Sequence, residues 1–225
     1  MKVVLFVAWG GLFAVPIIRK FLSSDCDVVR IYSQGIYRDR LEKYHPSYSL
    51  NYKDNVAEYV SKQGYEKYSI ITSINSAEVI SELRDNDIDY AFTIGYGEIV
   101  KEETLDAIKS RFINFHPGLL PSNQGADPIA SAIYYGLQET GVSIHRIDVG
   151  IDTGDLILEK KYIFASKEIY ESLQIKLGYV AASMIDKLVV LLSSNKKFSG
   201  KQASREIKYY NKLNKKNRAL DFNVK

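Results

Sequence analysis

The sequence contains very little cysteine and no long apolar segment. Cys26 is the only cysteine among the 225 residues, so no intramolecular disulfide can form, and a reducing compartment is expected. No apolar run approaches the length of a membrane span. The apolar run at Lys2–Val7 is too short for a signal sequence and leads into a Trp-Gly-Gly turn. Together these absences predict a cytoplasmic protein that does not contact membranes.

The net charge of the chain is small, but basic and acidic residues are unevenly distributed along it. The 30 Lys and Arg residues exceed the 27 Asp and Glu residues by three. From Lys196 onward, ten basic residues face only Glu206 and Asp221, which gives the last 30 residues +8 and leaves −5 on the first 195. A basic end can bind nucleic acid, but a solvated terminus is the simpler interpretation, so we expect no nucleic-acid partner. We divide the chain into a main domain, residues 1–195, and a basic tail or small packing element, residues 196–225.

Short apolar runs alternate with amphipathic ones along the main domain. Val3–Ala8 and Asp27–Tyr32 are predicted strands on either side of a helix over Phe13–Leu22, and such a β–α–β unit implies parallel strands. The alternation predicts a doubly wound, mostly parallel, Rossmann-like α/β sheet with a short C-terminal appendage. Residues 34–52 are rich in tyrosine and predict a long loop. The remaining predicted strands are Tyr90–Ile94, Phe112–Phe115, Val142–Ile147 and Leu156–Phe164, and the remaining predicted helices are Asn55–Gln63, Ser76–Arg84, Glu102–Ser110, Asp127–Tyr135 and Lys167–Ser193.

An amide and an imidazole occur together at the end of one predicted strand. Because strand side chains alternate with period two, Asn114 and His116 should lie on the same face, and Pro117 should end the strand because it has no N–H to donate. Other polar segments also follow predicted strand ends, and ligands of open α/β sheets bind beyond the carboxyl ends of the strands. We therefore expect four segments to meet at one edge of the sheet: Trp9, Tyr96, His116 and Asp148–Asp152.

The run from Asn114 to Ile157 resembles the folate-dependent formyltransferase family, which includes glycinamide ribonucleotide, methionyl-tRNA and amino-sugar formyltransferases. Gly95–Val100 resembles the segment that holds the folate in this family, and Phe13–Ile17 resembles the first helix of the tRNA-directed branch. The likeness fades beyond residue 160 or so. The matching pieces are Asn-x-His-Pro-x-Leu-Leu-Pro (114–121), Gly-Ala-Asp-Pro-Ile (125–129), Thr-Gly-Val-Ser-Ile-His (140–145) and Asp-Thr-Gly-Asp (152–155).

The resemblance implies that Asn114, His116 and Asp152 are the catalytic residues. In formyl transfer an amine attacks a carbonyl carbon, so an oxyanion forms and the nitrogen must lose a proton. Asn114 and His116 would donate to the oxyanion. Asp152 would orient His116, or hold a water that carries the proton. We expect no metal.

The resemblance also implies N10-formyltetrahydrofolate as the co-substrate. Glycine-containing loops let backbone groups pair with the edge of a pterin, while isoleucine side chains supply apolar walls. The expected folate contacts are Tyr96, Gly97, Glu98, Ile99, Val149, Gly150 and Ile151.

A further group of residues is expected to contact the acceptor. Trp9, Gly10 and Gly11 form a turn before a helix and could hold a phosphate, although they are not a GxGxxG fingerprint. Asn123 and Gln124 stand where the family commonly has an aromatic or basic pair. For His145, a structural or substrate-contacting role is favoured over a catalytic one.

The acceptor expected from the resemblance is a nucleotide-linked amino deoxysugar of the dTDP or GDP type, used in surface polysaccharide (lipopolysaccharide O-antigen) synthesis. The stretch after Ser199 is too short for the C-terminal β-barrel of the tRNA-directed branch. Tyr134–Gly136 and His145–Asp148 look more like the amino-sugar and tRNA branches than the purine branch. The alternatives are a methionyl-tRNA or glycinamide ribonucleotide formyltransferase, and a non-catalytic folate- or sugar-binding module. The long last helix and the tail could pack against a second copy, so we expect a homodimer.

Overall fold

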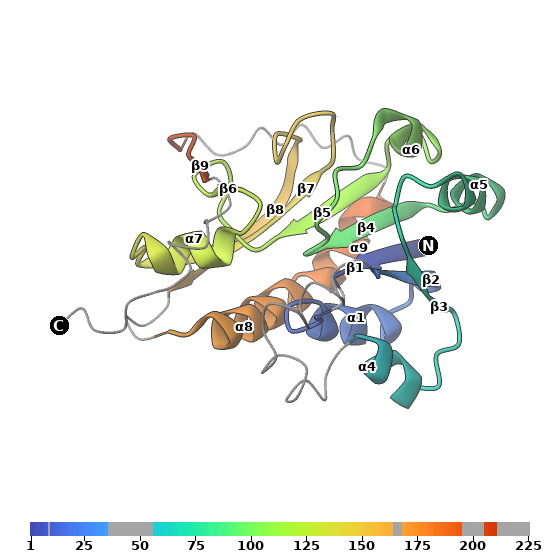
Figure 1. The fold of residues 1–225 in the computed structure, drawn as a ribbon, viewed down its shortest axis with the longest axis horizontal. Helices are drawn as coiled ribbons and strands as arrows, with labels where there is room; N and C mark the ends of the chain where they lie inside the picture. The colour runs from blue at the N-terminus through green and yellow to red at the C-terminus, as the bar shows by residue number, and fades with distance from the viewer. Residues whose placement is uncertain (9, 36–55, 164–167, 195–204, 211–225) are drawn as a thin grey trace.

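The computed structural model describes residues 1–8, 10–35, 56–163, 168–194 and 205–210. Its centre is a seven-stranded sheet in the order β3-β2-β1-β4-β5-β7-β8 (Figure 1). The strands from β3 to β5 are parallel, whereas β7 and β8 are each antiparallel to the preceding neighbour. The prediction of a mostly parallel, doubly wound sheet is confirmed. In chain order these strands are β1 Lys2–Val7, β2 Asp27–Gln34, β3 Tyr68–Ile71, β4 Tyr90–Ile94, β5 Phe112–His116, β7 Glu139–Arg146 and β8 Leu156–Ile163.

Helices cover both faces of the sheet, and the alternation of side chains along β1 shows why. Val3, Leu5 and Val7 are buried in one apolar cluster with α1, α4, α8 and α9, while Val4 and Phe6 are buried in a second cluster with α5 and α6 (Figure 1). A strand buried on both faces needs a continuous apolar run, as β1 has. The helices are α1 Ala14–Leu22, α4 Val56–Lys62, α5 Ala77–Asp85, α6 Glu102–Asp106, α7 Pro128–Tyr134, α8 Tyr170–Ala182 and α9 Ile185–Ser193.

Local signals explain where several helices begin and end. Helix α5 begins after Ser76, whose side chain accepts a hydrogen bond from the amide of Val79. Helix α7 begins after Asp127, has Pro128 in its first turn, and is followed by Gly136 at φ +62°. The long helix predicted over residues 167–193 is instead two helices, α8 and α9, separated at Ser183. The Ser183 hydroxyl donates to the carbonyl of Val180, so it competes with the backbone ladder at that point.

Three strands were not predicted because they are short or lack a clear alternation. They are β3 at the edge of the sheet, and the two-residue strands β6 Gln124–Gly125 and β9 Tyr209–Tyr210, which pair with each other in parallel. The predicted tyrosine-rich loop 34–52 lies outside the described residues from residue 36 onward.

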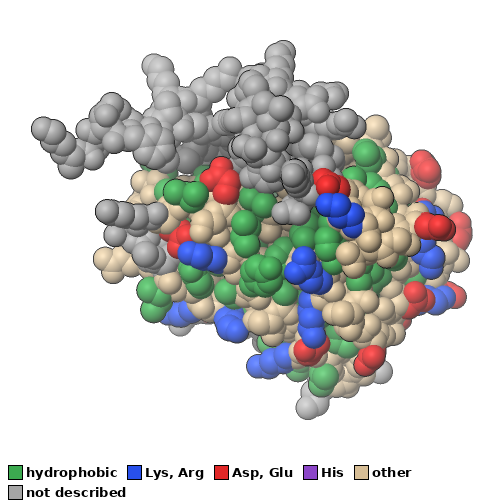
Figure 2. All heavy atoms as spheres, turned by 90° about the horizontal axis from the view of Figure 1, so that it is seen from below, with side chains coloured by type: hydrophobic (Ala, Val, Ile, Leu, Met, Phe, Trp, Pro, Cys, Tyr) green, Lys and Arg blue, Asp and Glu red, His purple; other side chains and the backbone are tan. Residues whose placement is uncertain are grey.

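The face formed by α1, α4 and α8 carries acidic and basic side chains interspersed among apolar ones (Figure 2). None of the helices in the described ranges combines the length and apolar character needed to cross a bilayer.

Candidate active site

Strands β5 and β7 bring three polar side chains to the same part of the sheet. Asn114 and His116 lie two residues apart on β5, and His145 on β7 is the register partner of Asn114. Directly opposed residues of an antiparallel pair lie on the same face, so the His145 imidazole is next to the Asn114 amide. His116 and His145 are both buried. The local polar cluster is therefore built where the sheet changes from parallel to antiparallel.

The loop between β7 and β8 carries the fourth polar residue, Asp152. The conformation of this loop is set by the Asp148 carboxylate, which accepts hydrogen bonds from the Gly150 amide at 3.1 Å and the Thr153 hydroxyl at 2.7 Å. Asp152 itself has φ +55°, a left-handed conformation that aspartate tolerates better than most residues. A Cβ atom at Gly154 would lie 2.0 Å from the Arg146 carbonyl oxygen, so only glycine permits this close approach.

Asp152 does meet His116, as expected, but one part of the prediction about this loop needs correction. Asp148–Asp152 was expected to meet the other segments beyond the carboxyl ends of the strands. Because β7 is antiparallel, the loop leaves it beside the start of β5, where the Ile147 amide donates to the Phe112 carbonyl at 3.0 Å. The loop then returns over the sheet to bring Asp152 to His116. Trp9, expected at the same edge, lies outside the described residues.

Asp152 joins the two histidines. Its Oδ1 atom lies 3.5 Å from Nδ1 of His116 and 3.6 Å from Nε2 of His145. Nδ2 of Asn114 lies 3.2 Å from the same His145 nitrogen. The three residues proposed as catalytic, distant in sequence, therefore lie in one cluster, and His145 lies between Asn114 and Asp152.

Hydrogen bonds fix the orientation of the Asn114 amide. The buried hydroxyl of Thr93 donates to Oδ1 of Asn114 at 2.9 Å, which leaves Nδ2 to donate to Nε2 of His145. Nδ1 of His145 lies 2.8 Å from the Arg146 carbonyl, to which only a protonated nitrogen can donate. His145 thus carries its proton on Nδ1 and accepts at Nε2. Sequence analysis missed Thr93, because its place beside Asn114 depends on the β4–β5 register.

His116 is fixed by a different contact. Its Nε2 lies 2.7 Å from the carbonyl oxygen of Asn123, so this nitrogen carries a proton and Nδ1 faces Asp152. Burial lowers the pKa of His116 below its usual value, and the opposing charge of Asp152 does not restore it. Near pH 7 the imidazole is therefore neutral, with its basic atom Nδ1 beside the carboxylate.

Asp152 is held as a carboxylate. Burial raises its pKa, but the charge that His116 carries once it is protonated in acid, the contact with His145 and the Gly125 amide outweigh burial and lower the pKa to about 2. The Gly125 amide donates to Oδ2 of Asp152 at 3.1 Å, and the Gln124 side chain donates to its main-chain oxygen at 3.1 Å. Asn123 and Gln124, expected to contact the acceptor, thus also bind protein groups that position His116 and Asp152.

Comparisons with known proteins identify the family of the chain. Residues 1–206 match the family model described as formyl transferase. The chain belongs to the formyl transferase family. It is 34% identical over 152 residues to the methionyl-tRNA formyltransferase of Neisseria meningitidis serogroup B, which covers 66% of this chain and 48% of the relative. The chain thus spans about half the length of the curated relatives that it matches in this way.

Solved structures of formyl transferases share the fold. The phosphoribosylglycinamide formyltransferase of Bacillus halodurans superposes with a TM-score of 0.66 at 25% identity, covering 87% of this chain and 97% of that one. The N-formyltransferase of Helicobacter canadensis, solved with folinic acid and dTDP-3-aminofucose, superposes with a TM-score of 0.67 at 17% identity, covering 94% of this chain and 71% of that one.

The residues that resemble the folate site of the formyl transferases lie on two loops. Ile99, Val149 and Ile151 expose large apolar side chains to solvent. The Glu98 carboxylate is already used within the protein. It accepts hydrogen bonds from the Ser73 hydroxyl, the Ile74 amide and the Asn75 side chain. Its side chain therefore braces the loop, and Tyr96 packs the edge of its ring on Phe6.

Asn75 is a loop-building residue that sequence analysis did not single out. Its side chain donates to the carbonyl of Ile99 and accepts from the Lys101 amide and the Thr104 hydroxyl. Gly10 and Gly11 lie in the turn before α1, where the Gly11 carbonyl accepts from the Val15 amide at 2.7 Å.

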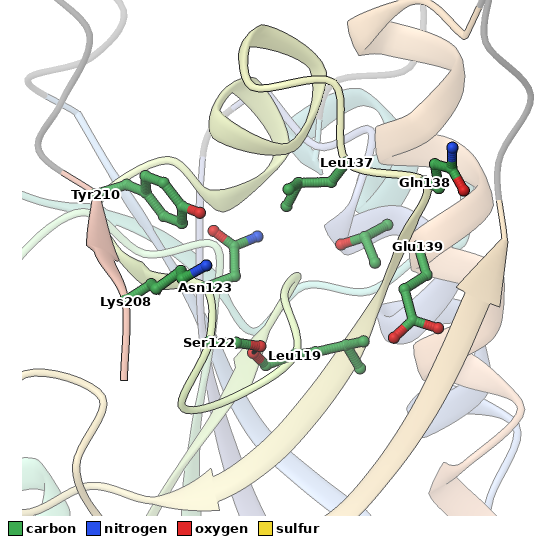
Figure 3. Close-up of a pocket in the computed structure, with 9 residues that line it drawn as sticks. Leu119, Ser122, Asn123, Leu137, Gln138, Glu139, Lys208 and Tyr210 are labelled. Atoms are coloured by element: carbon green, nitrogen blue, oxygen red, sulfur yellow. Dashed lines mark hydrogen bonds between the residues drawn. The ribbon is translucent and has the colours of Figure 1, made fainter. Parts of the chain in front are cut away.

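A cavity of about 200 Å³ lies beside the cluster and does not include it (Figure 3). Of the predicted site residues that the structure describes, only Asn123 lines it. Its other walls come from Leu119, Ser122, Leu137, Gln138, Glu139, Thr140, Lys208 and Tyr210.

Proposed function

We propose that the protein transfers a formyl group from N10-formyltetrahydrofolate to the primary amine of a nucleotide-linked amino sugar. The observation that carries formyl transfer is the cluster of Asn114, His116 and Asp152, within a chain of the formyl transferase family. A donor for an oxyanion and an acceptor for a proton are the two groups this reaction requires, and the cluster supplies both.

Asn114 acts on the oxyanion. The amine attacks the formyl carbon, and the carbonyl oxygen gains a negative charge in the tetrahedral intermediate. Thr93 and His145 hold the amide with its NH₂ group in a fixed direction, and one of its two N–H groups donates to His145. The second N–H is the donor for the oxyanion. A donor held in place before the reaction stabilises the developing charge without reorganisation.

His116 and Asp152 act on the proton. The attacking nitrogen gives its proton to Nδ1 of His116, because Nε2 already donates to Asn123. The imidazolium that forms is stabilised by the ionised Asp152. As the intermediate collapses, the bond from carbon to N10 breaks and the proton passes from His116 to N10. The products are the formamide and tetrahydrofolate, and His116 returns to its neutral form.

The folate is proposed to bind between Tyr96–Ile99 and Val149–Ile151. The exposed apolar side chains of Ile99, Val149 and Ile151 support this assignment. Main-chain groups of Gly97 and Gly150 would pair with the pterin. Glu98 would contribute by shaping its loop, since its carboxylate binds the turn at residues 73–75.

An amino-sugar nucleotide is the acceptor that we favour, and the likeness of Tyr134–Gly136 and His145–Asp148 to the amino-sugar and tRNA branches supports it over glycinamide ribonucleotide. The Helicobacter canadensis N-formyltransferase, which has the same fold, was solved with dTDP-3-aminofucose, a ligand of this kind. We propose that the phosphates of the nucleotide bind near Gly10 and Gly11, at the start of α1. Methionyl-tRNA is the second candidate, because the Neisseria relative that is 34% identical is a methionyl-tRNA formyltransferase.

One panel of reactions separates these functions. The protein is incubated with N10-formyltetrahydrofolate and, separately, with dTDP-, GDP- and UDP-linked amino sugars, glycinamide ribonucleotide and methionyl-tRNA. Mass spectrometry then follows the gain of one formyl group. We expect gain on an amino-sugar nucleotide alone. Gain on methionyl-tRNA, with a rate that falls steeply as salt rises, would establish the second candidate. Folate binding with no formylated product would point to a binding module.

We also propose a cytoplasmic homodimer. The exposed side chains of Ile175, Tyr179 and Val190 on α8 and α9 support an interface there. Light scattering at several concentrations tests the dimer, and a constant monomer mass would refute it.

A further inference from the structure

We infer that residues 205–210, which we call the C-terminal strap, hold residues 119–125 in the position that the active site needs. Residues 119–125, which we call the catalytic loop, follow β5 and include β6. The inference rests on the proposed function to this extent: it takes His116 and Asp152 to be catalytic. It assigns a specific role to a part of the chain that sequence analysis described as a basic tail or small packing element.

The strap binds the catalytic loop through directed hydrogen bonds along its length. A guanidinium nitrogen of Arg205 donates to the Leu120 carbonyl at 3.0 Å. The Lys208 amide donates to the Pro121 carbonyl at 3.1 Å, and the Lys208 carbonyl accepts from the Gln124 amide at 3.0 Å. Strands β6 and β9 complete the contact. A Cβ atom at Gly125 would lie only 2.2 Å from the main-chain carbonyl oxygen of Tyr210, so the two backbones approach as closely as glycine allows.

The same loop touches the catalytic residues from its other side. The Asn123 carbonyl accepts from Nε2 of His116 at 2.7 Å, and the Gly125 amide donates to the Asp152 carboxylate at 3.1 Å. Each of these main-chain groups is within one residue of a hydrogen bond or strand pair made by the strap. A shift of the loop would move the acceptor that fixes His116 and the donor that fixes Asp152.

Arg205 anchors the strap to the sheet. Its two terminal nitrogens lie 2.5 and 2.7 Å from the two carboxylate oxygens of Glu159 on β8. The side chains of the pair are 26% and 16% exposed, so solvent screens it only in part. A bidentate pair of this kind is stronger and more directional than a single-point contact. Arg205 thus joins β8, the strap and the catalytic loop in one set of contacts.

A cavity and one aromatic contact lie beside these hydrogen bonds. The cavity described above is lined by Lys208 and Tyr210 of the strap and by Ser122 and Asn123 of the loop, which lie on the same side of it, across from Leu137, Gln138 and Glu139 (Figure 3). Tyr210 does pack on Tyr135, with ring centroids 4.7 Å apart. Arg205→Ala would therefore remove the side-chain hydrogen bonds of Arg205 while leaving this aromatic contact in place.

Arg205→Ala tests the inference with two measurements. We expect kcat for the acceptor identified by the panel to fall roughly 10- to 100-fold with little change in KM, since a small misplacement of reacting groups can cost about 100-fold. Independently of activity, hydrogen exchange followed by mass spectrometry should be faster in residues 119–125. Arg205→Lys, which keeps the charge but not the fork, should recover part of both effects.

Lys161→Ala is the matched control. Lys161 also lies on β8 and pairs with a carboxylate, that of Glu139, but this pair is about half exposed, and among the described residues it forms no hydrogen bond with the strap. It should leave both kcat and exchange unchanged. If Arg205→Ala unfolds the protein, Glu159→Gln makes the same test more gently, because it keeps the size of the side chain while removing the bidentate ion pair.

The outcomes separate this inference from the proposed function. Unchanged exchange and unchanged kcat in Arg205→Ala would overturn the strap alone. Faster exchange with no loss of kcat would also overturn it, because the loop would then be free to move without consequence. Full activity of Asn114→Ala and His116→Ala would overturn the proposed mechanism while leaving the exchange result standing. Loss of activity on deleting residues 200–225 is expected from the strap, so it would not by itself indicate tRNA binding.

Discussion

The parallel half of the sheet and the junction between β5 and β7 are built in different ways. Around β1 and β2, side chains such as Leu5 and Ile31 are fully buried among many apolar neighbours, and no single polar contact determines the fold. At the junction, the positions of Asn114, His116 and Asp152 depend on a few directed hydrogen bonds. The first region contributes stability, and the second is where polar groups are held for chemistry. Substitutions should separate the two.

The largest effect should come from the junction itself. Replacing Asn114 or His116 by Ala, or Asp152 by Asn, removes a group that acts on the oxyanion or on the proton. We expect kcat to fall by about 10²–10⁴-fold for each, the range typical of oxyanion donors and general acid–base groups. Single-turnover kinetics with saturating formyl donor measures this. Thermal unfolding of each variant within a few degrees of wild type would show that the loss is chemical.

Near-wild-type turnover in all three variants would contradict the distinction between the parallel half and the junction. In that case the junction would be a structural polar cluster, and formyl transfer would have to be sought elsewhere or abandoned. Non-additivity gives a second check, since residues that act on the same step should lose less in combination than the sum of their separate losses.

The parallel half should behave in the opposite way. Ile31 on β2 is fully buried and lies three strands from β5. Ile31→Ala should lower the free energy of unfolding by about 2–5 kcal/mol, through lost burial and the cavity left behind, and Ile31→Val by about 0.5–1.5 kcal/mol. Urea denaturation measures both. The kcat of the folded protein should stay within about twofold of wild type, and a loss that scales with destabilisation would contradict the separation of the two regions.

Asp152 should also contribute to stability, but in a way that depends on pH. Its folded-state pKa is lowered from 3.8 to about 2, so its contribution is present in full above the unfolded value and is lost as the pH falls through about 2. The shift corresponds to about 2 kcal/mol. The difference in unfolding free energy between wild type and Asp152→Asn should therefore be constant above pH 5 or so and shrink toward pH 2. A difference independent of pH would show that the carboxylate is not held in its charged form.

The sequence predicted the parallel half well and the junction only in part, for a physical reason. Apolar runs such as Val3–Val7 are local signals, and so are the caps Ser76 and Asp127. The identity of Asn114, His116 and Asp152 was available through the resemblance to a family. Their arrangement was not, because it depends on which strands are neighbours. The reversal of β7 places His145 opposite Asn114 and sends the Asp152 loop back over the sheet.

Contacts between distant segments were beyond local patterns for the same reason. Arg205 and Glu159 are 46 residues apart and show no mutual signal in the sequence. Asn123 and Gln124 were expected to face the acceptor, yet main-chain and side-chain groups of this pair bind His116 and the Asp152 loop. Two-residue strands such as β6 and β9 have no periodicity to detect.

The smallest predicted effect comes from a residue of the parallel half that contacts the junction. Thr93 lies on β4 within the parallel half, is buried, and donates to Oδ1 of Asn114. Thr93→Val keeps the shape but leaves the Asn114 oxygen without this donor, so the amide should lose its fixed orientation. We expect kcat to fall about 5- to 10-fold, in line with roughly 1 kcal/mol for one neutral hydrogen bond, with KM unchanged. Thr93→Ser, which retains the hydroxyl, should restore most of kcat. Equal losses in both variants would instead indicate that Thr93 acts through packing, and the orientation of the amide would then rest on His145 alone.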